Sequence, residues 1–364
     1  MIDPKKPNNK LAKLPADFDC DQVDILKLAN KANLALSNLN GQTSATASNF
    51  KNAMFLAETF SIPEAVASSA VENVITTVNE ALQSRALPES ELTPEQKETG
   101  KYSVATSVGF KLLSDKKHLA TNDYLRIQKE LDLPQTGIRN IPGYVIADKI
   151  TKEIYYTPPE GEALVRTLLK NFEEYFNDRA DDPDPLIKMA ILHYQFEAIH
   201  PFPDGNGRTG RILMPLYLVA RGRLVLPVLF LSEYILNNRS EYYRLLRGVT
   251  YNNEWKPWIV YILNGVIAQA NKTSMALVQI IETKKAFQVK IPDRIPVFRR
   301  TDLLDFLFTT AVFSRDQLAK QLNVHVNTAS SYLNTLTKTG LIKVFKRKNS
   351  KIFYVPGFIK ILNQ

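Results

Sequence analysis

Twelve residues near the middle of the chain, 200–211, restrict the fold more than any other part of the sequence. They are His-Pro-Phe-Pro-Asp-Gly-Asn-Gly-Arg-Thr-Gly-Arg, and they stand between two apolar segments with helical spacing. The two prolines disfavour helical conformation at the residues before them, so the first helix must end at about His200. The glycines then allow a tight turn before the second helix begins. The pattern predicts a helix, a short loop and a second helix, with the imidazole of His200 at the mouth of the loop.

This loop has the composition of an anion-binding site. Gly205 and Gly207 allow successive backbone N–H groups to turn toward one point, which the positive end of the following helix dipole also faces. Arg208 and Arg211 are three residues apart, so they share a helix face and can both reach phosphate oxygens. Asn206 adds a neutral donor. The sequence therefore predicts a phosphate cradle.

Two further residues add chemistry to this cradle. Asp204 supplies a carboxylate oxygen, the type of ligand that Mg²⁺ prefers. A histidine has an ordinary pKa of about 6.5, so His200 can be neutral at pH 7 and accept a proton from an attacking hydroxyl. A hydrolytic metal site built from His193, His200 and Asp204 is a weaker alternative, because the prolines change the chain direction and no third imidazole is near. His193 is more simply a core histidine.

Glycines 205, 207 and 210 also match G-x-G-x-x-G, the dinucleotide-binding fingerprint. That fingerprint requires a strand directly before it, whereas residues 186–199 have helical spacing. The chain contains no G-x-x-x-x-G-K-[ST] and no kinase H-R-D or D-F-G sequence. The sequence therefore disfavours these nucleotide-binding folds.

The composition excludes several classes of protein. The chain is 45% hydrophobic and 23% charged, which is typical of a folded protein, and its single cysteine, Cys20, cannot form an internal disulfide. No stretch approaches 18 uninterrupted apolar residues, and the N-terminus carries prolines and aspartates where an export signal needs an apolar run. We expect a cytoplasmic protein without a membrane segment.

The net charge of +9 belongs to the C-terminal end. Residues 284–364 contain 15 Lys and Arg against four Asp, whereas residues 1–283 contain 31 basic and 33 acidic side chains. An anionic macromolecule would therefore meet the C-terminal part.

The spacing of apolar and turn residues predicts a mainly α protein. A Pro-rich extended leader covers residues 1–25, and a polar linker covers 88–101. Predicted helices cover residues 26–39, 61–82 (with Ser61 as N-cap and Pro63 in the first turn), 103–113, 121–131, 161–176, 185–199, 208–220, 233–247 and 255–273. One β-hairpin is predicted from residues 144–146 and 154–156, around a turn at 148–152.

The last 60 residues have the pattern of a winged helix-turn-helix domain. Ser314 begins a capping box, a helix runs to Leu322, and a second cap at Asn327 starts a helix that ends near Gly340. Two strands, 341–345 and 352–355, flank a basic turn at 346–351. The second helix offers polar side chains but only Lys338 as a cation, so DNA binding, protein recognition and a structural role all stay open.

The segment H-P-F-P-D-G-N-G-R-T-G-R resembles the signature of the Fic family, H-x-F-x-[DE]-G-N-G-R-x-x-R, at every defined position. The similarity extends over most of residues 10–270. It implies a Fic-fold helical core with a β-hairpin flap at 101–283, after an N-terminal helical region at 1–100 that carries an inhibitory helix. The winged helix would occupy 284–364.

The resemblance implies transfer of AMP from Mg-ATP to a Ser, Thr or Tyr hydroxyl of a protein substrate. His200 would be the general base and Asp204 the metal ligand. The residues implied in ATP binding are Gly205, Asn206 and Gly207 around the α-phosphate, Arg208 at the α- and β-phosphates, Arg211 at the γ-phosphate, Thr209 and Gly210 beside them, and Tyr242 and Tyr243 near the adenine. Ile154, Tyr155 and Tyr156 would form the flap that holds the target chain by strand addition.

A second short pattern concerns control. Ser68, Glu72 and Asn73 fit [ST]-x-x-x-E-[GN], which is similar to the inhibitory helix of the family. If Glu72 pairs with Arg211, the γ-phosphate loses its partner and ATP binds with its α-phosphate badly placed for attack. The competing interpretation is a solvated carboxylate on a helix.

Alternatives remain at the level of function. The chain is also consistent with a DNA-binding transcriptional regulator that senses a nucleotide, and with a Fic-type enzyme that uses another nucleotide, transfers phosphate or removes AMP. Glycines 205 and 207 argue against phosphate transfer, because phosphorylating relatives lack that pair. A protein substrate is the expected partner, with DNA and a second copy of the chain, as a homodimer, as further candidates.

Overall fold

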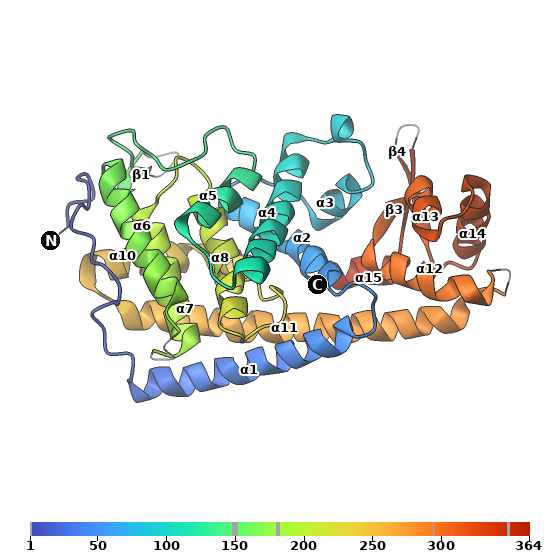
Figure 1. Ribbon diagram of the computed structural model, residues 1–364, viewed down its shortest axis with the longest axis horizontal. Coiled ribbons are helices and arrows are strands. Elements are labelled where there is room, and N and C mark those ends of the chain that lie inside the picture. Colours follow the sequence, from blue (N-terminus) through green and yellow to red (C-terminus); the bar gives the residue numbers. More distant parts are fainter. Residues whose placement is uncertain (1, 148–151, 180–182, 294, 348–349) are drawn as a thin grey trace. The chain divides into compact units, whose positions relative to one another are not determined.

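The computed structural model describes residues 2–147, 152–179, 183–293, 295–347 and 350–364 (Figure 1). Its contacts divide the chain into two compact units. The first unit comprises residues 1–40 and 101–271, and the second comprises residues 41–100 and 272–364. The boundaries fall within three helices, α1 (Val23–Ala47), α4 (Pro94–Lys116) and α11 (Trp255–Lys290). The N-terminal 100 residues, which the sequence suggested as one region, are thus divided between the two units.

The first unit is built around a helix that is buried on every side. Every residue of this helix, α7 (Pro185–Ile199), except Glu197 is buried, as is typical of a central helix. It packs against α6 (Glu162–Asn177) and α8 (Asn206–Ala220), and the indole N–H of Trp258 in α11 donates to the carbonyl of Ala190 at 2.8 Å. The other elements of this unit are α5 (Thr121–Glu130), α9 (Ser232–Asn237), α10 (Arg239–Asn252) and the antiparallel pair β1 (Ile146–Ala147) and β2 (Ile154–Tyr156).

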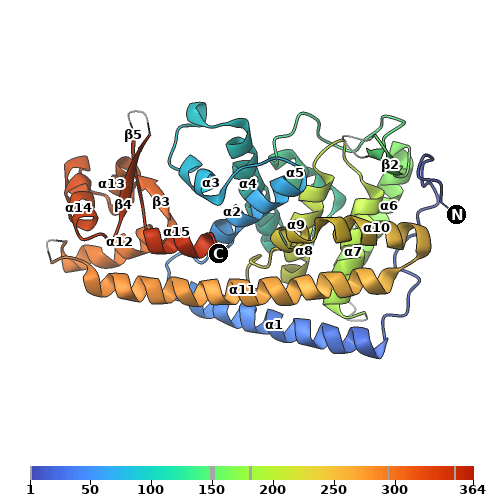
Figure 2. The ribbon, with the colours of Figure 1, turned by 180° about the vertical axis from the view of Figure 1, so that it is seen from behind.

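The second unit combines helices from both ends of its sequence with a small sheet (Figure 2). Its N-terminal segment contains α2 (Met54–Val71), α3 (Val78–Ser84) and the 3₁₀ turn η1 (Glu89–Glu91). Its C-terminal segment contains α12 (Val297–Thr309), β3 (Val312–Ser314), α13 (Arg315–Leu322), α14 (Val326–Lys338), β4 (Lys343–Arg347), β5 (Ser350–Tyr354) and α15 (Pro356–Leu362). The strands form an antiparallel sheet in the order β3-β5-β4. The capping box at Ser314, with Gln317 as its third helical residue, is present.

The predicted helix at 61–82 was wrong at both ends. Helix α2 starts at Met54, whose N–H donates to Asn52 Oδ1 at 2.9 Å, and Pro63 lies inside it. The helix stops because Asn73 adopts a left-handed conformation with φ of +67°, and α3 then begins with a capping box between Thr77 and Glu80. Ser61 is a mid-helix residue.

Three other local predictions need correction. The expected linker at 88–101 becomes helix at Pro94, because Thr93 and Gln96 form a capping box that sequence reasoning overlooked. Helix α11 continues 17 residues past the expected end, since neither glycine nor proline occurs between Gly265 and Pro292. Helix α14 is capped by His325 rather than Asn327, whose N–H donates to the His325 ring at 3.3 Å.

Parts of two expected turns lie outside the described residues. These are residues 148–151 of the hairpin turn and residues 348–349 of the basic turn. Among the helices that the structure describes, none combines the length and apolarity needed to span a bilayer.

Candidate functional site

The chain runs from helix α7 through a short loop into helix α8, as predicted, although Gly207 lies inside α8 rather than in the turn. Helix α7 ends at His200, whose φ of 48° and ψ of 59° turn the chain out of the helix, and α8 begins at Asn206. Gly205 has φ of +81°, and a Cβ there would lie 2.5 Å from Leu133 Cδ1. A larger residue would therefore be strained and would also clash, so the turn requires glycine.

Asn206 fixes the loop rather than presenting its amide at the mouth. Its Oδ1 accepts from the N–H of Phe202 and its Nδ2 donates to the Phe202 carbonyl, both at 2.8 Å. The side chain is 3% exposed. The amide thus closes a ring across the turn, and the predicted role as a phosphate donor stays untested.

Asp204 and Arg208 form an ion pair at the start of α8. The distance from Arg208 Nη2 to Asp204 Oδ1 is 3.0 Å, and the Asp204 side chain is 49% exposed whereas that of Arg208 is 7% exposed. Nowhere in the described ranges do three or more His, Cys, Asp or Glu side chains gather as a metal site. A single, accessible carboxylate at a helix N-terminus fits Mg²⁺, which commonly binds through one or two carboxylates, substrate phosphates and water. Asp204 thus suits the predicted ion.

Thr209 and Gly210 face the protein interior. Thr209 is fully buried, and a Cβ on Gly210 would lie 2.7 Å from Glu197 Oε1 and 3.2 Å from Phe196 Cδ1. Gly210 therefore permits the close approach of α8 to α7, and its assignment to the ATP-binding surface stays a prediction. Arg211 is 2% exposed and belongs to the largest buried side chains.

Arg139 is a site residue that sequence reasoning missed. It is 3% exposed, its Nε donates to the His200 carbonyl at 2.6 Å, and its Nη2 donates to the carbonyls of Ile199 (3.1 Å) and Pro159. Its own N–H donates to the Pro201 carbonyl at 2.9 Å. This guanidinium satisfies the carbonyls at the C-terminal end of α7 and fixes the backbone that carries the imidazole. No local pattern around residue 139 signals the role, because every partner comes from elsewhere in the chain.

We predict that Arg139→Met destabilises the protein by about 2–4 kcal/mol, because three carbonyls lose a charged donor. Chemical denaturation measures this loss. The matched control is Arg126→Met on the exposed side of α5, for which the change should stay within about 0.5 kcal/mol. Equal stability of the two variants would contradict the structural role of Arg139.

Tyr144 also lies beside His200. Its ring centroid is 5.6 Å from that of the imidazole, and its hydroxyl donates to the Pro203 carbonyl at 2.8 Å. His200 itself is half-buried. The catalytic candidate is therefore at the boundary between core and solvent, as predicted, and not sealed in the interior.

The two tyrosines expected near the adenine have different environments. Tyr242 is 1% exposed, and its hydroxyl lies 2.9 Å from His193 Nε2. Tyr243 is half-buried and has the Arg239 guanidinium over its ring, 5.7 Å from the centroid. Tyr243 is therefore the more accessible ring of the pair, and the predicted contact of both with adenine stays a prediction. Tyr242 supports it from behind, with ring centroids 5.2 Å apart.

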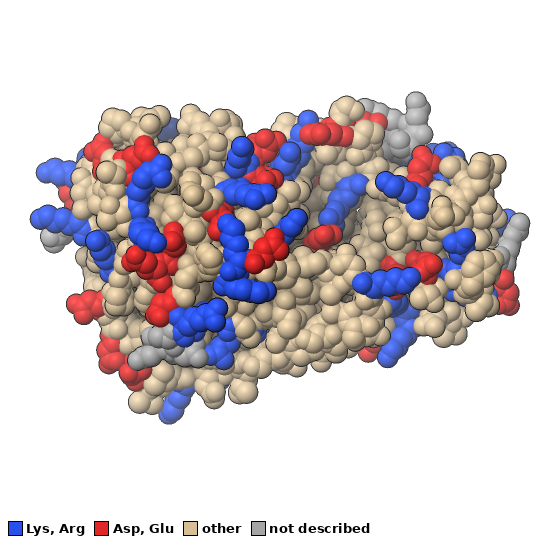
Figure 3. Space-filling model, in the orientation of Figure 1, with Lys and Arg blue, Asp and Glu red and all other residues tan. Residues whose placement is uncertain are grey.

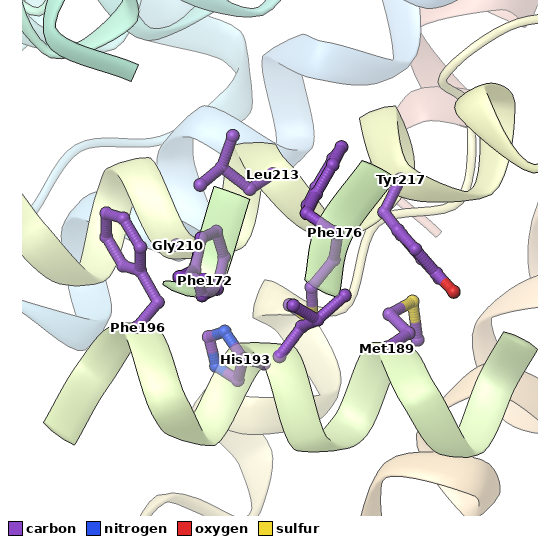
Figure 4. A pocket seen from close by; sticks show the side chains of 10 residues that line it. Phe172, Phe176, Met189, His193, Phe196, Gly210, Leu213 and Tyr217 are labelled. Carbon is purple, nitrogen blue, oxygen red and sulfur yellow. The ribbon is translucent and has the colours of Figure 1, made fainter. Parts of the chain in front are cut away.

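His193 is a core histidine, as predicted. Figure 4 shows its ring pointing from α7 into a small cavity between α6, α7 and α8, lined mainly by aromatic and aliphatic side chains. The ring also stacks on Trp258, with centroids 5.9 Å apart. Burial, together with the nearby charge of Arg211, lowers the pKa of His193 to about 3.

This depressed pKa predicts a pH dependence of stability. The folded pKa lies below the unfolded value of about 6.5, so the stabilisation is complete above pH 6.5 and is lost as pH falls toward 3. The full loss is on the order of 5 kcal/mol. His193→Gln, followed by denaturation at several pH values, should flatten the curve between pH 6.5 and 4. The control His118→Gln, at an exposed position, should leave the dependence of unfolding free energy on pH unchanged. An equal slope for both variants would refute the assignment of this dependence to His193.

The flap residues are only partly available to a partner. Tyr156 is 7% exposed, and its hydroxyl donates to the Ala198 carbonyl at 2.9 Å. Its side chain therefore anchors the hairpin in the core, and the predicted strand addition at the flap stays a prediction. Ile154 and Tyr155 are half-buried, and the Tyr155 carbonyl accepts from the Tyr251 hydroxyl at 2.6 Å.

The predicted inhibitory residues lie at the C-terminal end of α2, in the second unit. Ser68 is fully buried in the helix. Glu72 is the half-buried C-cap residue and Asn73 is the left-handed residue that ends the helix. Glu72 is therefore held at a helix terminus rather than along an exposed helix face.

Two family descriptions match this chain. That of the Fic/DOC family matches residues 118–218, and that of the Fic/DOC family N-terminal region matches residues 26–111. "Protein adenylyltransferase fic-1" of Caenorhabditis elegans is 33% identical over 118 residues, which are 31% of this chain and 21% of that protein. A protein of Aquifex aeolicus named "Probable protein adenylyltransferase" is 37% identical over 109 residues, which are 30% of this chain and 31% of that protein. The matches thus span less than a third of these curated relatives.

A solved structure shares the fold. A Fic domain containing signaling protein from Bacteroides thetaiotaomicron aligns with a TM-score of 0.51 and 16% identity, covering 67% of this chain and 97% of the other. The buried helix, the loop after it and the family matches together define a Fic-type helical domain. The chain belongs to the Fic/DOC family.

Proposed function

We propose that this protein transfers AMP from Mg-ATP to a Ser, Thr or Tyr hydroxyl of a target protein. The observation that carries the proposal is the loop at 200–211, in which a half-buried imidazole stands next to a turn that requires glycine and a helix N-terminus with two arginines. Helix N-termini of this kind bind phosphate groups. The names of the related adenylyltransferases support the same reaction.

In the proposed reaction, the target hydroxyl oxygen forms a bond with the α-phosphorus while the bond from that phosphorus to the β-phosphate oxygen breaks. His200 accepts the hydroxyl proton, and pyrophosphate leaves with the electron pair. Arg139 positions the backbone of His200, as described above. Arg208 and Arg211 balance the charge of the phosphates.

Asp204 would hold the Mg²⁺ ion, which neutralises charge on the phosphates when bound. The existing pair between Asp204 and Arg208 supports this, since it holds the carboxylate at the start of α8 while leaving it half-exposed. Arg208 would then exchange part of that pair for a phosphate oxygen.

The target chain would dock beside β2. A short antiparallel pair offers main-chain groups that can align an extended peptide without reading its sequence closely. Tyr156 anchors the hairpin, and Ile154 and Tyr155 would meet the target.

We also propose that Glu72 restrains the enzyme by competing with the γ-phosphate for Arg211. The position of Glu72 as a half-buried helix cap supports this, because such a carboxylate is already ordered before it meets a cation. A bidentate pair with a guanidinium is directional and strong enough to misplace a nucleotide.

The proposal is tested by incubating Glu72→Gly with target lysate, Mg²⁺ and ATP labelled at either the α- or the γ-phosphate. AMP transfer puts the α-label and no γ-label on protein. Phosphate transfer gives the reverse pattern. Absence of both labels, with a folded protein that binds ATP, would overturn the proposed activity.

A nucleotide-sensing DNA-binding regulator is the second candidate. The order α13, short turn, α14 and the hairpin β4–β5 supports a winged helix-turn-helix, and the net charge of this end is positive. On the face shown in Figure 3, however, Lys and Arg side chains of this part are scattered among acidic ones rather than gathered in a patch. A labelled 30-bp duplex tests the candidate: nanomolar binding that responds to ATP, without label transfer, would favour the regulator.

A further inference from the structure

The N-terminal segment of the second unit is attached to its C-terminal segment at a charged junction, which we call the Lys284 junction. It consists of Lys284 in α11, Asp305 in α12, and Asn49 and Phe50, which precede α2. Lys284 Nζ lies 2.7 Å from Asp305 Oδ1 and 2.7 Å from the Asn49 carbonyl oxygen. It also lies 3.7 Å from the centroid of the Phe50 ring.

This junction is mostly shielded from solvent. The side chains of Lys284 and Asp305 are 14% and 15% exposed, so screening by salt and water is reduced and each contact is worth more than on the surface. A second pair, Lys51 Nζ to Asp302 Oδ1 at 2.6 Å, lies beside it but is well exposed. Lys284 is therefore the main polar attachment.

The junction leads directly into the helix that carries the inhibitory residues. The rings of Phe50 and Phe55 lie 4.3 Å apart, and Phe55, in the first turn of α2, is 2% exposed. Helix α2 itself packs against α12. The chain after α2 is attached as well, since Gln317 Nε2 donates to the Arg85 carbonyl at 3.4 Å and Asn363 Nδ2 lies 3.1 Å from Asn79 Oδ1.

We propose that the C-terminal segment, residues 272–364, is the regulatory element that holds the inhibitory helix, and that the Lys284 junction couples the two. The proposal rests on the proposed inhibition by Glu72. The chain is attached to C-terminal elements both before and after α2. These contacts therefore hold the inhibitory helix in place. A ligand or partner that loosens these contacts would release α2, since restraining a segment in advance lowers the entropic cost of its docking.

The test uses Lys284→Met, which keeps the apolar stem and removes the charge. We expect hydrogen exchange of the α2 amides, residues 54–71, to accelerate about tenfold. Label transfer should rise about threefold to tenfold with Glu72 present and change less than twofold in the Glu72→Gly background. The matched control is Lys285→Met, an exposed lysine one position along the same helix, which should alter neither readout.

Each outcome bears on a separate claim. Unchanged exchange in α2 overturns the junction, and faster exchange without faster labelling overturns the coupling. Absence of label in Glu72→Gly overturns the proposed function, while the exchange result still decides the junction. Lys284→Arg, which keeps the charge, should resemble the wild type. If Lys284→Met fails to fold, Asp305→Asn weakens the same pair from the other side and decides by the same readouts.

Discussion

Replacing His200 by Ala in the Glu72→Gly background should lower the rate of label transfer by about 100- to 10,000-fold. This is the usual contribution of a positioned general base, and His193, the other imidazole of α7, is buried with its Nε2 2.9 Å from the Tyr242 hydroxyl. ATP should still bind with an affinity within a few-fold of the parent, because in the proposed binding mode the phosphates contact the backbone and arginines instead. Quantification of α-label on the target, together with a nucleotide titration, separates the two effects.

His118→Ala is the matched control for this experiment. His118 is exposed, and the contact of its ring is with the Lys116 carbonyl in its own turn. The His118→Ala variant should transfer label at the same rate as the Glu72→Gly parent. A His200→Ala protein that retains more than a third of the parent rate would eliminate His200 as the base and would favour a mechanism in which the target hydroxyl is activated otherwise.

Replacing Glu72 should activate the enzyme about 10- to 100-fold. A charged hydrogen bond to a guanidinium contributes about 1.5–3 kcal/mol, and in the proposed inhibition its loss would free Arg211 for the γ-phosphate. Glu72→Gln should activate nearly as much as Glu72→Gly, since the charge rather than the length of the side chain is responsible. Initial rates of α-label transfer at equal protein concentration measure both.

Two further variants make this expectation specific. Glu58→Gln changes a carboxylate on the same helix, outside the inhibitory pattern, and should leave the rate unchanged. Combining Glu72→Gly with Arg211→Ala should remove most of the activation, because the freed guanidinium is its cause. Full activation in that double variant would show that Glu72 acts through another residue.

Local sequence signals predicted the elements of the site well. The prolines that follow His200 and the asparagine and glycines of the loop indicated where α7 ends and α8 begins, to within two residues. These features act over three or four residues, so the sequence contains all the information needed. The errors at Thr93 and Asn327 are also local, since one overlooked a capping box and the other chose a residue two positions after the actual cap. The start of α2 was placed seven residues too late, at Ser61 instead of Met54.

Residue spacing did not predict which residues lie at the surface of the loop and which pack in the core. Gly210 and Tyr242 lie within or near the family pattern, yet they pack against α7 and His193. Burial depends on neighbours that are distant in sequence, and the period of a helix indicates a face without indicating what covers it.

The sequence alone determined that this chain is mainly helical, that a glycine turn with an adjacent histidine and two arginines interrupts its central helices, and that its C-terminal end is basic. Those properties follow from backbone preferences and charge, which each residue carries with it. Only the tertiary structure decided that Arg139 holds the His200 backbone and that α2 is attached to residues 272–364. These two features depend on hydrogen bonds between segments 60 or more residues apart, and local composition does not predict such pairs.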